Sequence, residues 1–134
     1  MSPATDYSAQ TTVIDGVSAV KLDDSASKTE VTILTGIGNI AYRMLVNEKN
    51  ILWTPTDNVA QFASAPAMGG VPFLWPWANR IDQDAYYVDG RKYLLNPELG
   101  NLRRDGNQKS IHGLLLFTSR WRVIAIQADR ARPG

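Results

Sequence analysis

The chain is built of short apolar segments, each ended by glycine, asparagine or aspartate, and this punctuation restricts the folds open to it. Asp15-Gly16 interrupts the apolar residues of 13–17, and Asp89-Gly90 interrupts the aromatic and apolar residues of 86–95. Aspartate followed by glycine suits the centre of a hairpin turn, because both residues tolerate positive φ. The sequence therefore predicts two β-hairpins, turning at these two pairs.

Other segments carry the two-residue period of a strand. Every second residue from 40 to 46 is large and apolar, which predicts a strand with these side chains on one face; they are Ile40, Tyr42, Met44 and Val46. A polar turn at 47–50 and a returning strand at 51–53 follow, and the alternation reappears at 121–127. No long stretch carries a helical stripe, so we expect an all-β fold, an antiparallel β-sandwich.

Composition sets broad limits on the class of protein. A length of 134 residues fits one domain, expected over 13–134, and the small and polar residues of 1–12 predict a flexible N-terminal tail. The net charge of +1 is no footprint for nucleic acid, and no segment approaches the ~20 apolar residues that cross a membrane. Because the chain starts without the regions of a signal peptide, the expected location is cytoplasmic.

The residues that carry chemistry gather in one aromatic segment and one later motif. The segment reads GGVPFLWPWANRI and contains Trp75, Trp77, Asn79 and Arg80, and His112 lies in the motif IHG. Polar groups are costly to bury without partners, so a rigid aromatic segment that ends in an amide and a guanidinium suits a polar ligand with apolar faces. A sugar ring fits this description.

These motifs together resemble a known family. The run GGVPFLWPWANRI, the Tyr86–Tyr93 hairpin and the IHGLL run before Trp121 are similar, in order and spacing, to the N-terminal part of the aldose 1-epimerase (galactose mutarotase) family. The resemblance implies a β-supersandwich, of which this chain supplies the first portion. It implies an isomerase of carbohydrate metabolism that interconverts the α and β anomers of free galactose or glucose. The implied partner is a small hexose, and no cofactor or metal is needed.

The resemblance also implies a role for each residue of the motifs. His112 matches the family's histidine in the sugar pocket, which helps to polarise the ring during opening, so it is the predicted catalytic residue. Asn79 and Arg80 match residues that bind the sugar hydroxyls and ring oxygen. The aromatic rings of Trp75 and Trp77, apart from the resemblance, make them predicted platforms for the apolar face of the sugar, and for at least one of them core packing is the preferred interpretation.

The residues alone leave simpler interpretations open. A single histidine is more often structural than catalytic, and an arginine usually forms a surface ion pair. Three further patterns predict no site, namely Gly36-Ile37-Gly38 without the third glycine of a dinucleotide fingerprint, the solvated pair Asp82 and Asp84, and the sparse charges of Arg103-Arg104.

The chemistry of a mutarotase needs more groups than the motifs provide. One base and one acid are required, and the resemblance places the base on a late glutamate and the acid on a second histidine, neither of which has a matching position here. We therefore expect a truncated domain with an incomplete site, which leaves a fragment, a split protein or a non-catalytic remnant open. The alternative function is a non-catalytic carbohydrate-binding or assembly module. Uncovered strand edges predict self-association or a complementing chain.

Overall fold

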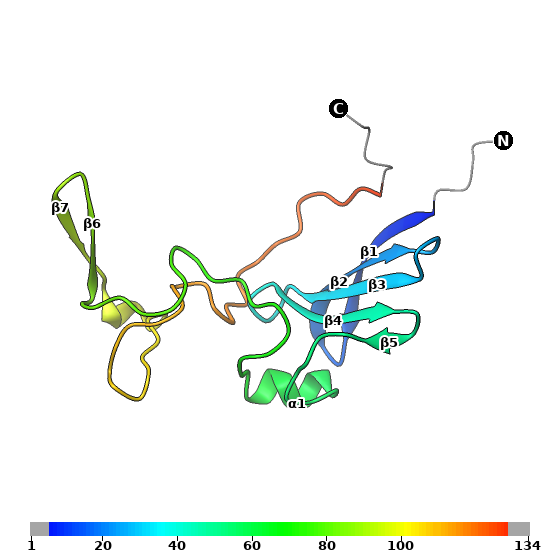
Figure 1. Ribbon diagram of the computed structural model, residues 1–134, viewed down its shortest axis with the longest axis horizontal. Coiled ribbons are helices and arrows are strands. Elements are labelled where there is room, and N and C mark those ends of the chain that lie inside the picture. The colour runs from blue at the N-terminus through cyan, green and yellow to red at the C-terminus, as the bar shows by residue number, and fades with distance from the viewer. Residues whose placement is uncertain (1–5, 129–134) are drawn as a thin grey trace.

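A five-stranded antiparallel sheet forms one end of the molecule (Figure 1). The computed structural model describes residues 6–128, and its strands lie in the sheet in chain order. They are β1 (Tyr7–Ile14), β2 (Val17–Asp24), β3 (Thr29–Leu34), β4 (Ile40–Val46) and β5 (Lys49–Asn50).

Both Asp-Gly pairs form the predicted hairpin turns. Asp15 and Gly16 have φ values of 49° and 81° between β1 and β2, and Asp89 and Gly90 have 49° and 73° in the second hairpin. Positive φ at both central residues gives the turn a twist that matches the twist of the strands. The two predicted hairpins are confirmed.

The first strand begins earlier than the sequence indicates. Residues 7–12, predicted as part of a flexible tail, pair with β2 from Tyr7 opposite Asp24 to Thr12 opposite Ala19. Their side chains are mostly exposed, so the strand is held by its backbone ladder and leaves no apolar signal in the sequence. The tail prediction is wrong for these residues, and residues 1–5 lie outside the described part of the chain.

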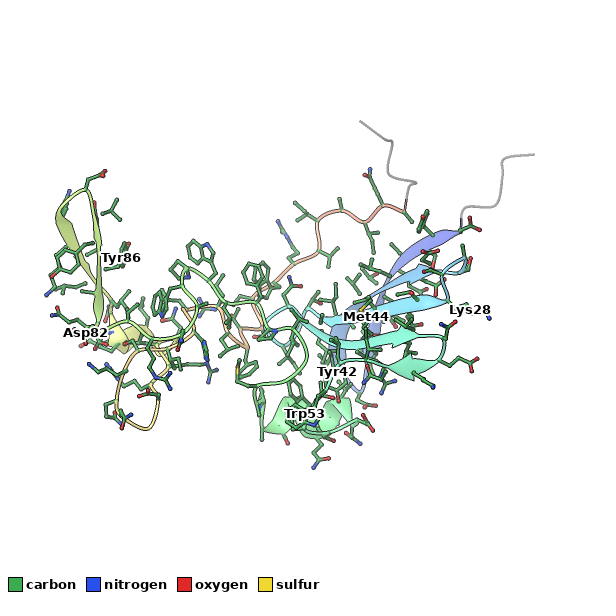
Figure 2. All side chains as sticks on the ribbon, in the orientation of Figure 1. Lys28, Tyr42, Met44, Trp53, Asp82 and Tyr86 are labelled. Atoms are coloured by element: carbon green, nitrogen blue, oxygen red, sulfur yellow. The ribbon has the colours of Figure 1, made fainter. Side chains whose placement is uncertain are left out.

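A β-bulge in β4 changes which side chains share a face. The register between β3 and β4 shifts beside Thr32, which leaves Tyr42 as an extra residue. Ile40 and Tyr42 are buried, whereas Met44 lies on the other side of the sheet from Tyr42 (Figure 2). The single face predicted for 40–46 is therefore wrong after Tyr42, because an inserted residue reverses the orientation of those that follow.

The turn after β4 is tighter than predicted. Asn47 and Glu48 have left-handed φ values of 48° and 67° and form a two-residue turn, so the returning strand begins at Lys49. The Oδ1 atom of Asn50 accepts two backbone N–H groups, at 3.1 and 3.2 Å, and strand pairing ends at that residue. The returning strand thus occupies 49–50 and not 51–53 as predicted.

A short helix, α1 (Val59–Ser64), covers one face of the sheet and closes the hydrophobic core (Figure 1). The rings of Tyr42 and Phe62 meet at its centre, with 5.2 Å between their centroids. The Tyr42 hydroxyl donates to the backbone oxygen of Thr56, so this buried polar group is satisfied. Burial raises the pKa of Tyr42. The other core members include Leu34 and Ile40.

A second, two-stranded sheet lies at the opposite end of the molecule (Figure 1). It consists of β6 (Ala85–Val88) and β7 (Arg91–Leu94), and the 3₁₀ turn η1 (Pro97–Leu99) follows. The rings of Tyr86 and Tyr93 stack across its strands with centroids 5.3 Å apart. This cross-strand pair supports a hairpin whose residues, apart from Ala85, are exposed.

The segment 121–127, predicted as a strand, is extended but unpaired within the described residues. It runs beside β1, and Trp121 and Gln127 each line an open cavity together with residues of that strand. No backbone hydrogen bond joins this segment to β1 in residues 6–128. Alternation alone did not form a strand here, because a strand also needs a ladder partner at hydrogen-bonding distance.

The proportions of secondary structure agree with the predicted class. Strands account for 37% and helices for 7%, and both sheets are antiparallel. The predicted all-β, sandwich-like class is confirmed. Within residues 6–128, no helix has the length and apolar character needed to cross a membrane.

Gly38 allows a distant turn to approach the sheet. Its φ is +66°, and its N–H donates to the backbone oxygen of Thr118 at 2.8 Å. A Cβ at this position would lie 2.3 Å from the backbone nitrogen of Phe117, whose side chain packs against the core. The connection from β3 to β4 and the turn at 115–118 are therefore held in direct backbone contact.

Replacing Gly38 tests this contact. Gly38→Ala and Gly16→Ala both place a side chain at left-handed φ, at a cost of about 1–2 kcal/mol each. A Cβ on Gly16 meets no atom within 4 Å, whereas one on Gly38 meets the backbone of Phe117. Gly38→Ala should lose about 1–3 kcal/mol more from overpacking. Urea unfolding curves measure the free energy of unfolding of the two variants. An equal loss in both would contradict the close approach of Gly38 to the backbone of Phe117.

Candidate functional site

The aromatic segment that begins at Gly69 is anchored on the large sheet. Val71 and Ala41 of β4 exchange two backbone hydrogen bonds, with nitrogen–oxygen distances of 2.9 and 3.0 Å. Gly70 has a φ of +55°, and a Cβ there would lie 2.3 Å from the carbonyl oxygen of Ala41. Gly70 therefore serves a close backbone approach to β4.

Two isolated bridges then join the segment to the IHG motif. Trp75 pairs in parallel with Gly113, and Arg80 pairs antiparallel with Ile111. A Cβ on Gly113 would lie 2.1 Å from the Trp75 carbonyl oxygen, which explains the glycine of the motif. Backbone pairing thus brings two motifs that are far apart in the sequence side by side.

Asn79 and His112 form a reciprocal pair at this junction. The His112 N–H donates to the Asn79 carbonyl oxygen at 2.9 Å, and the Asn79 N–H donates to His112 Nδ1 at 3.2 Å. Because Nδ1 accepts, the neutral ring carries its proton on Nε2. Both residues have left-handed φ, 61° and 64°. Asparagine and histidine take this conformation more readily than most residues, and here it occurs at both ends of the backbone contact.

Arg80 is held in place by two acceptors. Its Nε donates to Oδ2 of Asp105, and its Nη1 donates to Oδ1 of Asn79 at 3.0 Å. The side chain of Asp105 is 8% exposed, against 54% for that of Arg80. The carboxylate is therefore covered, while the guanidinium keeps N–H groups open to solvent. The ion pair foreseen as the simple alternative is present, together with the contact to the neighbouring amide.

Asn79, Arg80, Asp105 and His112 are called the donor cluster below. The Asn79 side-chain oxygen accepts from Arg80, which leaves its NH₂ group as a donor. The Nε2–H of His112 and the remaining N–H groups of Arg80 are the other donors of the cluster. With the imidazole neutral, the charges of Arg80 and Asp105 cancel. The cluster combines hydrogen-bond donors with no net charge. It lies on an open surface, since Asn79 and Arg80 are exposed.

Three ion pairs hold together the two segments that form the donor cluster. One lies within the cluster, and the others join Lys109 to Asp82, with Nζ 2.8 Å from Oδ1, and Arg104 to Asp84. Ser110 also donates to Asp84. In each of the three aspartates, the hydrogen bond from the basic partner is the main cause that lowers the pKa.

Sequence reasoning missed Asp105 and took Asp82 and Asp84 for solvated residues without a role. Each has a basic partner, although Asp82 keeps 89% of its side chain exposed. Asp105-Gly106-Asn107 does carry a turn signal, since the Asp105 Oδ1 accepts the backbone N–H groups of Asn107 and Lys109, each at 2.9 Å. The signal identifies a turn but not its partner in the aromatic segment.

The two tryptophans of the segment take different positions. Trp75 is 54% exposed and is joined through its backbone to Gly113, next to the donor cluster. Trp77 is half-buried, and its Nε1 is buried without a hydrogen-bond partner among the described residues. Trp75 is therefore the more accessible of the two predicted stacking platforms.

Comparison with known proteins adds no assignment. A scan against protein-family models finds no match, and a search of curated proteins finds none. In the described range 6–128, no cluster of three or more His, Asp or Glu side chains is placed to hold a metal ion. The similarity to the aldose 1-epimerase family stays a prediction from the motifs.

Acid is expected to loosen the donor cluster. The pKa of Asp82, Asp84 and Asp105 in the folded state lies below the ordinary value of 3.8. Their ion pairs therefore stabilise the fold above that value, and this contribution is lost as the pH falls through the folded-state pKa. Urea midpoints compared from about pH 6 to about pH 2.5 should fall more steeply in the wild type than in a variant with all three aspartates changed to asparagine. An equal decrease of the urea midpoint with falling pH in both proteins would contradict the stabilising role of the three ion pairs.

Proposed function

We propose that this chain is an aldose 1-epimerase-like protein whose donor cluster binds a free aldohexose and acts in the interconversion of its anomers. The observation that carries the proposal is the convergence of Asn79, Arg80 and His112 into one uncharged set of donors. A neutral sugar presents hydroxyl and ring oxygens as acceptors, so an uncharged donor set suits it better than an anion. An exposed Trp75 beside the cluster suits the apolar face of the ring.

The reaction assigns His112 a position at the ring oxygen. Its Nε2–H can donate a hydrogen bond that polarises the ring oxygen while the bond between the anomeric carbon and that oxygen breaks. The acid that protonates the ring oxygen and the base that takes the proton of the anomeric hydroxyl are not supplied by the donor cluster. Rotation of the aldehyde and closure on its other face give the second anomer. Arg80 and Asn79 hold hydroxyls during these steps.

Asp105 is poorly suited to be the base of this reaction. Its Oδ2 accepts from Arg80 and its Oδ1 accepts two backbone N–H groups, and these bonds lower its pKa. A carboxylate stabilised in this way takes up a proton reluctantly. This favours a second candidate function, carbohydrate binding without anomer interconversion, which needs the same donors but no base.

Sugar titrations test the binding claim common to both candidates. Galactose should change the fluorescence of the tryptophans, and Arg80→Ala or His112→Ala should weaken binding about ten-fold, the cost of losing one or two hydrogen bonds to the ligand. Arg122→Ala removes an exposed arginine outside the cluster and should bind as the wild type does. Unchanged binding in both cluster variants would refute the site.

Polarimetry of freshly dissolved α-galactose separates the two candidates. Anomer exchange faster than in buffer, and lost in His112→Asn, would support the epimerase. Galactose binding without acceleration would instead support the non-catalytic carbohydrate-binding function. A protein that neither binds galactose nor accelerates its exchange would refute both proposals.

A further inference from the structure

A cavity of about 420 Å³ lies beside the run of residues that follows the IHG motif. It is lined by residues 99–101, by Arg103 and by residues 114–120. Its walls are apolar where leucines and Phe117 contribute and polar where Asn101, Ser119 and the arginines contribute. The volume lies within the range of small-molecule sites in proteins.

The two arginines of this cavity lack acidic partners. The ion pairs of residues 6–128 involve neither Arg103 nor Arg120, and no aspartate or glutamate lines the cavity. The neighbouring Arg104 is bound to Asp84, and Arg80 to Asp105, so the contrast is a local one. Two arginines without an acidic partner among the described residues therefore line one cavity.

The position of Arg103 is fixed by the core. Its guanidinium carbon lies 5.0 Å from the centre of the Phe117 ring, and its Nη2 makes one long hydrogen bond, 3.4 Å, to the backbone oxygen of Leu116. Phe117 packs edge-on against Phe62 of α1, and its backbone contacts Gly38. Arg103 is thus oriented before any ligand binds, and most of its N–H donors remain open.

We propose that this cavity binds a small organic phosphate monoester, with the phosphate at Arg103 and Arg120 and the organic part against the leucines and Phe117. A phosphate offers several oxygens to two guanidinium groups and to the hydroxyl of Ser119. The cavity is larger than a phosphate alone requires. The proposal is independent of the sugar site, where the charge of the single arginine is already balanced.

Titration calorimetry with phenyl phosphate, inorganic phosphate and phenol tests the assignment in buffer free of other phosphates. Phenyl phosphate should bind more tightly than inorganic phosphate, and phenol should not bind measurably. Arg103→Gln and Arg120→Gln should each weaken phenyl phosphate binding about ten-fold or more, because each removes a charged hydrogen-bonding group. Arg122→Gln, which removes the same charge from an exposed position outside the cavity, should leave affinity unchanged.

The variants also separate folding effects from binding effects. Arg103→Gln removes the contact with the Phe117 ring. The side chain of Arg120 makes no hydrogen bond or ring contact within residues 6–128. The Arg120→Gln variant should therefore unfold at the urea midpoint of the wild type. Equal losses of affinity in Arg122→Gln would mean non-specific attraction and overturn the site. If only Arg80→Gln lost affinity for phenyl phosphate, the phosphate would bind at the donor cluster and the proposed cavity site would be wrong. Equal affinities for phenyl phosphate and inorganic phosphate would overturn the role of the apolar wall.

Discussion

Backbone pairing between the aromatic segment and the IHG motif is the interaction on which both candidate sites depend. The bridges at Trp75 and Arg80 fix the motif from both ends, and the glycine at 113 allows a separation that no other residue would permit. The donor cluster forms at the motif itself, and the run 114–120 that follows it contains Phe117, which packs against the core. Without these bridges His112 would have no fixed relation to Arg80.

Charge compensation gives the two sites different chemistry although both contain arginine. Arg80 lies over a covered carboxylate, so the donor cluster is uncharged and suited to hydroxyl groups. Arg103 lies against an aromatic ring and lines, together with Arg120, a cavity without acidic residues, so its charge is available to an anion. The identity of the neighbour, rather than the arginine itself, decides which ligand is favoured.

The predictions from sequence succeeded where the signal is local. Asp15-Gly16 and Asp89-Gly90 set the φ values of their own turns, and both hairpins formed as expected. The predictions were wrong where the outcome depends on a partner. Residues 7–12 became a strand because β2 pairs with them, and 121–127 remained unpaired because, within residues 6–128, it makes no backbone hydrogen bonds to the neighbouring β1. The bulge at Tyr42 is likewise invisible in a pattern that keeps its period of two.

The sequence by itself determined the antiparallel class and the types of residue available for chemistry, since turn residues and strand periodicity act over a few positions. It also pointed to Asn79, Arg80 and His112 as one group through their motifs. Only the tertiary structure decided that Asp105 neutralises Arg80, because their contact spans 25 positions of the chain. A charge is cancelled or left free by the groups that surround it in space, and the sequence does not specify that arrangement locally.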